Sequence, residues 1–175
     1  IKLDVADWEV HALRAMVLRL LTNLAERETA YRQAVAARPE FFEWRFGEPE
    51  LPETTDRQRD PRSTSKPLRV HAADGRHVDL AGSVDRIDVD PEGHSLLVLD
   101  YKLGSEPARR LQRVETAESV QLPLYALAVR DLLGAPAVSL GLDALGGGER
   151  TVQISPSQRD VWRPTAEAPG YACRT

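Results

Sequence analysis

The sequence predicts an α/β or α+β domain in which a mixed central sheet is flanked by helices. Helical patterns occupy the beginning and the middle of the chain, and short apolar segments bounded by turn residues lie between and after them. A length of 175 residues fits a single domain with a sizeable core. Because the chain begins with Ile1 instead of methionine, we expect residues 1–175 to be one domain taken from a longer protein.

A long amphipathic helix is expected over about residues 7–36. Its apolar residues recur at the spacing of one helix face, and they are Val10, Leu13, Val17, Leu20, Leu21 and Leu24. Pro39 ends this pattern, since proline cannot continue a helix. A second helix is expected over about residues 119–133, with Pro123 near its first turn, where a missing N–H costs little.

Strands are expected between and after these helices, at residues 41–46, 68–72, 77–89, 95–102, 138–142 and 151–154. Residues 96–99 are apolar on both faces, so their strand is expected to be central in the sheet. The apolar positions of residues 77–89 change parity, which predicts a bulge or sharp twist near Asp85 and Arg86. The tail from Pro156 shows no regular pattern and is expected to be irregular.

Residues 48–66 are rich in Pro, Thr, Arg and Asp and lack periodicity, so we expect a mobile loop. The net charge of -4 does not indicate a nucleic-acid binder, because such domains usually carry a basic excess. Two basic clusters fit either a solvated surface or contacts with phosphates. They are Arg57, Arg59, Arg62 and Lys66 in the loop, and Arg109, Arg110 and Arg113 further along.

The composition also excludes several classes of protein. No apolar run approaches the length that spans a bilayer, and no secretory signal pattern opens the chain. Cys173 is the only cysteine, so no disulfide framework can form within the chain. We therefore expect a protein without a membrane partner, located in the reducing cytoplasm.

The residues that suggest chemistry lie on a predicted β-hairpin, with residues 90–93 as its turn. An even-numbered turn would set Asp100 opposite Ser83 and make Asp85 and Asp100 diagonal neighbours on one face. Lys102 shares this face because it lies two residues beyond Asp100. Two carboxylates can bind a divalent cation, and a lysine beside them suits metal-assisted cleavage of a phosphodiester.

These residues also have structural explanations. Asp100 ends an apolar strand and needs a partner, which Arg86 or Lys102 could provide in a buried salt bridge. Gln121 and Tyr125 share one face of the second helix, as residues at the edge of an ordinary amphipathic helix also do. An unrelated α/β domain with a structural Asp-x-Lys is therefore one alternative.

Four segments, in this order, resemble the motifs of the RecB-like nucleases, a branch of the PD-(D/E)xK superfamily. They are residues 39–47, 82–88, 100–104 and 121–125, and the likeness covers roughly residues 5–165. The resemblance is closest to the C-terminal nuclease domain of AddB-type helicase–nucleases. It implies a restriction-endonuclease-like core and a deoxyribonuclease dependent on Mg²⁺ or Mn²⁺. It favours exonuclease over endonuclease action, in DNA repair or recombination.

The resemblance also implies roles for individual residues. Asp85, Asp100 and the backbone carbonyl of Tyr101 would bind the metal. Lys102 would orient or deprotonate the attacking water, or stabilise the developing charge. The Gln-x-x-x-Tyr motif of the family would hold the site and the DNA, and an early acidic residue would support it. These residues correspond here to Gln121, Tyr125 and Glu43, and the expected DNA contacts further include Arg86, Arg109, Arg110 and Arg113.

The expected partners are single-stranded DNA or duplex ends, and a helicase or recombination complex. The sequence departs from the family in two respects. It has no Gly-x-x-x-His helix upstream of the core, and His11, His71, His77 and His94 are expected to be surface residues. An iron–sulfur cluster is not possible from this chain alone, because the family's cluster uses four cysteines. A catalytically inactive scaffold or DNA-binding module of a helicase–nuclease complex is therefore the second hypothesis.

Overall fold

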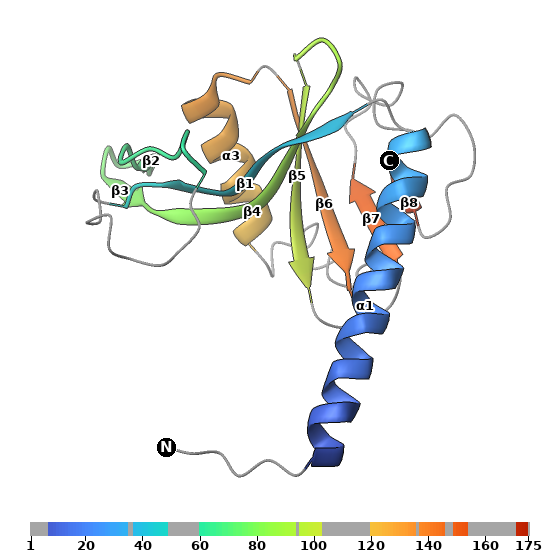
Figure 1. Cartoon of the computed structure of the whole chain (residues 1–175). Helices are drawn as coiled ribbons and strands as arrows, with labels where there is room; N and C mark the ends of the chain where they lie inside the picture. The colour runs from blue at the N-terminus through green and yellow to red at the C-terminus, as the bar shows by residue number, and fades with distance from the viewer. Residues whose placement is uncertain are drawn as a thin grey trace.

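The computed structural model describes residues 7–34, 37–48, 60–93, 95–102, 120–135, 137–145, 149–153 and 171–174. Within these ranges, a six-stranded sheet lies between two helices, α1 (Asp7–Ala34) and α3 (Gln121–Leu133). Figure 1 shows α1 in front of the sheet and α3 behind it. This architecture confirms the expected α/β domain with a mixed central sheet flanked by helices.

The main sheet has the strand order β1-β4-β5-β6-β7-β8. Its strands are β1 (Arg38–Phe46), β4 (Gly82–Val89), β5 (Ser95–Lys102), β6 (Ala137–Ala144), β7 (Glu149–Gln153) and β8 (Tyr171–Arg174). β5 pairs with β6, and β7 with β8, in parallel, whereas all other neighbours are antiparallel. The parallel pair needs a crossover, which α3 provides. β5 lies inside the sheet, as its apolar sequence predicted.

Two predictions about strands are wrong. Residues 77–89 form two strands instead of one, because β3 (His77–Leu80) pairs with β2 (Leu68–His71) in a separate two-stranded sheet. β4 begins after Ala81 and pairs with β1 and β5. The tail is not wholly irregular either, since β8 adds to the edge of the main sheet beside β7. In both cases the pairing partner, rather than the local pattern, determines the strand.

The hydrophobic core lies on the α3 side of the sheet. Its buried members include Trp44, Phe46, Val84, Ile87, Val89, Leu96, Val98, Leu122, Ala128, Val129 and Leu142. Val84 and Ile87 both belong to this core although they stand three residues apart on β4, where alternate residues normally share a face. The alternation of core-facing residues along β4 is therefore interrupted between Val84 and Ile87, as the parity change near Asp85 and Arg86 predicted.

α1 covers the other side of the sheet only with its C-terminal half, and its N-terminal half extends past the sheet (Figure 1). The large apolar residues of α1 that are exposed lie in its first 15 residues: Trp8, Val10, Leu13, Met16, Val17, Leu18 and Leu21. Arg27 and Tyr31 are buried where the helix meets the sheet. Neither helix of the described chain is long and apolar enough to cross a membrane.

The described end of the segment expected to be a mobile loop is held against β1. The Asp60 carboxylate accepts the N–H of Phe42 at 3.3 Å, and the indole N–H of Trp44 donates to the carbonyl of Arg62 at 3.0 Å. Residues 49–59 lie outside the described residues. The mobility expected for residues 48–66 therefore stays a prediction.

Candidate active site

The hairpin of β4 and β5 has a register two residues away from the expected one. Arg86 pairs with Leu99 and Val89 with Leu96, and the N–H of Asp90 donates to the carbonyl of Ser95 at the turn. The expectation that Asp100 lies opposite Ser83 is therefore wrong, because the turn is longer than assumed. A shift of two residues keeps the paired side chains, from Arg86 to Val89 and from Leu96 to Leu99, on the faces that the sequence predicts.

One further step along this register brings Asp85 level with Asp100. Backbone pairing between β4 and β5 stops before that step, at Arg86 and Leu99. The Asp85 carboxylate then replaces the missing backbone partner, since its Oδ2 accepts the N–H of Tyr101 at 2.8 Å. The sheet thus opens locally, and a carboxylate oxygen of β4 reaches the backbone of the Asp-x-Lys segment.

The direction of the Tyr101 carbonyl follows from these contacts. In a strand, the N–H and C=O of one residue point toward the same neighbouring strand. The N–H of Tyr101 points to Asp85, while the carbonyl of Lys102 accepts the N–H of Leu145, beyond the end of β6. The carbonyl of Tyr101 is therefore directed to the edge of β5 where Asp85 lies.

Asp100 and Lys102 form an ion pair at the end of β5. Asp100 Oδ2 lies 2.7 Å from Lys102 Nζ, and the two side chains are 3% and 30% exposed, respectively. Leu96 and Val98 belong to the core on the α3 side, so the alternation of β5 places Asp100 and Lys102 on that side as well. The Asp100 side chain is buried, whereas the Lys102 side chain is partly exposed.

Glu43 extends the line of carboxylates to β1. The register on either side, Phe42 with Arg86 and Trp44 with Val84, sets Glu43 across from Asp85. Its backbone has φ 51°, a left-handed conformation uncommon for residues other than glycine, and local strain of this kind often occurs at functional sites. Ser83 Oγ donates to Glu43 Oε2 at 3.4 Å. Glu43, Asp85 and Asp100 therefore follow one another across β1, β4 and β5.

Gln121 and Tyr125 meet β4 close to this line. Gln121 Nε2 donates to Tyr125 Oη at 3.0 Å, and the Tyr125 ring packs edge-on against Phe46. A Cβ atom at Gly82 would lie 2.9 Å from the Phe46 ring and 3.1 Å from the Tyr125 ring. Only glycine allows this approach, which brings the exposed Gln121 side chain and the tyrosine hydroxyl to the strand that carries Asp85.

Arg86 lies on the opposite side of the sheet and is 2% exposed. Its guanidinium donates to the carboxylates of Glu28 and Asp88 and to the hydroxyl of Tyr101. Burial alone would lower the pKa of Arg86, but the hydrogen bonds with Glu28 and Asp88 outweigh it and raise this pKa. The placement argues against the DNA contact expected for Arg86, because its donors are used within the protein.

The other expected site residues fall into two groups. Arg109, Arg110 and Arg113 lie outside the described residues, as does His94. His71 and His77 are exposed neighbours on β2 and β3, and His11 is exposed on α1.

Among the side chains that the structure describes, no group of three His, Cys, Asp or Glu could hold a metal ion. Within that part of the chain, an ion would need the two carboxylates together with backbone or water oxygens.

Sequence reasoning missed two residues near the site, Glu28 and Asp88, which hold Arg86 in place. A signal was present for α1, because the helical spacing of Leu20 and Leu24 continues to Arg27, with Glu28 beside it. A charge at the position of the next core residue indicates a buried polar contact.

Comparison with known protein families identifies this chain as similar to one group of enzymes. A family model described as the PD-(D/E)XK nuclease superfamily matches residues 2–168. No curated protein matches the chain. The matched range contains every candidate site residue from Glu43 to Tyr125.

Proposed function

This chain belongs to the PD-(D/E)XK nuclease superfamily, and we propose that it hydrolyses DNA phosphodiesters at a site formed by Asp85, Asp100 and Lys102. The observation that carries the proposal is the 2.8 Å hydrogen bond from the Tyr101 N–H to Asp85 Oδ2. It brings a carboxylate of β4 to the Asp-x-Lys segment of β5, where the two strands are no longer paired.

The donors at this point fit a divalent cation. Both side chains are carboxylates, and the Tyr101 carbonyl is directed to the same edge, so the set consists of hard oxygen atoms. The buried Asp100 carboxylate already attracts a cation, the ammonium group of Lys102. Mg²⁺ is bound through few protein carboxylates and keeps several waters, so two carboxylates suffice, and Mn²⁺ accepts similar ligands. When bound, such an ion polarises a phosphate oxygen and lowers the pKa of a bound water.

The protein side chains have separate tasks in this proposal. Asp85 and Asp100 hold the ion, with the Tyr101 carbonyl as a further ligand. Lys102 is partly exposed, so its ammonium group can orient the attacking water or stabilise charge on the phosphate, and its neutral amine can deprotonate that water. Glu43 supports the carboxylates from β1.

Gln121 and Tyr125 contact the DNA strand beside this site. Their hydrogen bond joins an exposed amide to a phenol hydroxyl, and both groups lie on α3, on the side of the sheet to which Asp100 and Lys102 point. Arg109, Arg110 and Arg113 follow the Asp-x-Lys segment in sequence and would add contacts with phosphates.

We further propose a RecB-like nuclease, closest to the AddB-type C-terminal domain, that acts in DNA repair or recombination. In this proposal residues 1–175 are one domain of a longer cytoplasmic protein, and a helicase or recombination complex is its partner. Its substrates are single-stranded DNA or duplex ends, and exonuclease action is favoured over endonuclease action. These finer statements rest on the four sequence motifs.

The test compares wild type with Asp100→Asn and Lys102→Ala on end-labelled single-stranded, linear duplex and circular DNA. Asp79→Asn is the matched control, because Asp79 is a carboxylate in an exposed ion pair with Arg69 on the separate hairpin. We expect wild type and the control to cut linear DNA with Mg²⁺ or Mn²⁺, and both site variants to lose cleavage. Unchanged cleavage in either site variant would refute the assignment.

A non-cleaving DNA-binding module is the second candidate. It is favoured by one observation, that no three ligating side chains gather among the described residues. This candidate predicts that wild type binds DNA ends with metal present and leaves them intact. Cleavage that disappears in Lys102→Ala excludes it.

A further inference from the structure

The side of the sheet opposite the proposed site contains a buried charged network centred on Arg86. Arg86 Nη1 and Nη2 donate to the Glu28 carboxylate of α1 at 2.6 and 2.8 Å. The same guanidinium is bound by the Asp88 carboxylate, two residues along β4. Two carboxylates thus fix the planar group from two directions, which suits the fork geometry of arginine.

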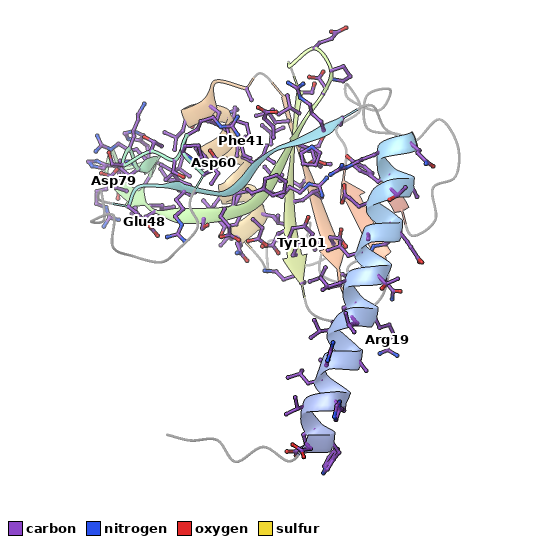
Figure 2. The ribbon with its side chains drawn as sticks, viewed as in Figure 1. Arg19, Phe41, Glu48, Asp60, Asp79 and Tyr101 are labelled. Carbon is purple, nitrogen blue, oxygen red and sulfur yellow. The ribbon has the colours of Figure 1, made fainter. Side chains whose placement is uncertain are left out.

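Arg86 makes one further contact, and this contact leads to the site. Its Nη1 donates to the hydroxyl of Tyr101 at 3.1 Å. Tyr101 is the residue between Asp100 and Lys102, toward the C-terminal end of β5 (Figure 2). Since the N–H of Tyr101 is bound by Asp85, two consecutive residues of β4 hold Tyr101 at its backbone and at the tip of its ring.

The two contacts with Tyr101 lie just beyond the point where backbone pairing between β4 and β5 ends. Backbone pairing between β4 and β5 ends at Arg86 and Leu99, so the following residues of β5 lack the ladder on that edge. The Asp85 carboxylate restrains the backbone there, and the Tyr101 ring restrains the rotation of the strand about its axis. Both restraints act on the segment that presents Asp100 and Lys102.

We propose that Arg86 is a positioning residue for the Asp85, Asp100 and Lys102 site, acting through the side chain of Tyr101. The proposal rests on the nuclease function proposed above. Glu28 holds the guanidinium in place from α1, and Arg86 lies on the far side of the sheet and touches no DNA. Sites of this kind tolerate displacements of about 0.5 Å, so small movements of Tyr101 reduce function.

A merely structural explanation makes a different prediction. α1 has a second buried ion pair with the sheet, in which Arg27 Nη2 lies 2.6 Å from Asp143 Oδ1. This pair attaches the same helix to β6, where Asp143 is the register neighbour of Tyr101, and its loss leaves the contacts of Arg86 and Asp85 with Tyr101 in place. If Arg86 only attaches α1, loss of either pair has the same consequences at the site.

The experiment uses Tyr101→Phe, Arg86→Lys and the control Asp143→Asn in the full chain. Tyr101→Phe removes one hydroxyl group and leaves the ring and both carboxylate contacts of Arg86. Each variant is examined by thermal unfolding, hydrogen exchange at the Tyr101 amide, calorimetric binding of Mn²⁺, and separate kcat and KM values for DNA cleavage.

We expect Tyr101→Phe to remain folded while the backbone amide at position 101 exchanges at least about tenfold faster, because the Asp85 contact loosens. Mn²⁺ binding weakens about 3- to 10-fold, and kcat falls about 10- to 100-fold with little change in the KM for DNA. Arg86→Lys shows the same pattern with a larger loss of stability, because lysine cannot form the fork. Asp143→Asn lowers the unfolding temperature and leaves exchange, Mn²⁺ affinity and kcat near wild type.

Wild-type exchange and Mn²⁺ affinity in Tyr101→Phe would overturn the proposal. The proposal would also be overturned if Mn²⁺ affinity and kcat fell in all three variants in proportion to the decrease in their unfolding temperatures. If wild type neither binds Mn²⁺ nor cuts DNA, the proposed function fails. Amide exchange in Tyr101→Phe still decides independently whether the Arg86 contact holds Tyr101 against Asp85.

Discussion

Replacement of Lys102 by alanine tests both the stability of the folded protein and the function of the site. In the folded protein the ammonium group lies 2.7 Å from a carboxylate oxygen of Asp100, whose side chain is 3% exposed. Lys102→Ala leaves that buried charge without this cation. We therefore expect the variant to be inactive and also less stable than wild type.

The expected loss of stability in Lys102→Ala follows from the burial of the Asp100–Lys102 ion pair. Removing one member of a buried ion pair costs roughly 3–5 kcal/mol, and exposed pairs contribute about 1 kcal/mol or less. Lys102 is 30% exposed, so water screens part of the interaction and we expect a loss of about 2 kcal/mol. For a chain of this size the unfolding temperature falls by roughly 4–8 °C.

Thermal and urea unfolding of Lys102→Ala, Asp100→Asn and the double variant measure this cost. Asp100→Asn removes the buried charge, so its free energy of unfolding should stay within about 1 kcal/mol of wild type. The double variant should be more stable than Lys102→Ala, since the asparagine needs no cation. Added Mg²⁺ should raise the unfolding temperature of Lys102→Ala, because a bound divalent cation stabilises the folded state.

Two results would refute this reasoning. One is a Lys102→Ala variant as stable as wild type, which would mean that solvent already neutralises Asp100. The other is strict additivity of the two substitutions, because coupled charges give a non-additive double variant.

Three further outcomes are expected. Gly82→Ala should cost about 1–3 kcal/mol and reduce cleavage, because its Cβ would lie 2.9 Å from the Phe46 ring and 3.1 Å from that of Tyr125; unchanged unfolding and activity would contradict the close approach. Burial tends to raise the pKa of Asp60, but hydrogen bonds from Arg62 and from the backbone lower it below 3.8. Asp60 therefore stabilises the protein above that pH and loses this contribution as the pH falls through its lower folded-state pKa. Urea unfolding should show a deficit for Asp60→Asn near pH 7 that shrinks as the pH is lowered below 3.8; a deficit independent of pH would contradict the sign. EDTA should abolish DNA cleavage, and Mg²⁺ or Mn²⁺ should restore it; cleavage that survives EDTA would exclude a divalent ion.

Local sequence patterns were sufficient for most elements of the fold. The helical spacing of α1 and the proline near the start of α3 predicted both helices to within about two residues, because these signals lie within one segment. The apolar run from Leu96 to Leu99 predicted a central strand for the same reason. Patterns did not separate β3 from β4, because the alternation of Val78 and Leu80 continues to Val84 and only the pairing partners of the two strands differ.

The residues of the proposed site were also predicted from the sequence, but their arrangement was not. Asp85 and Asp100 were expected to share a face; the observed register differs by two residues and ends at Arg86 and Leu99, before it reaches Asp85, so this expectation stays a prediction. The contact between Asp85 and the Tyr101 backbone could not be predicted, since it depends on where pairing between two strands stops. The parity change at Asp85 and Arg86 was the one local sign of this irregularity.

The sequence by itself therefore determined which chemical groups are present and which element carries each of them. Carboxylates, a lysine and a glutamine–tyrosine pair have fixed spacings within their segments, and strand and helix periodicity fixes their faces. The tertiary structure alone decided which buried charges meet. Glu28 and Arg86 are 58 residues apart in the chain, and no periodicity links them. Burial makes such pairs specific, because a charge removed from water must find its partner wherever the fold brings one within reach.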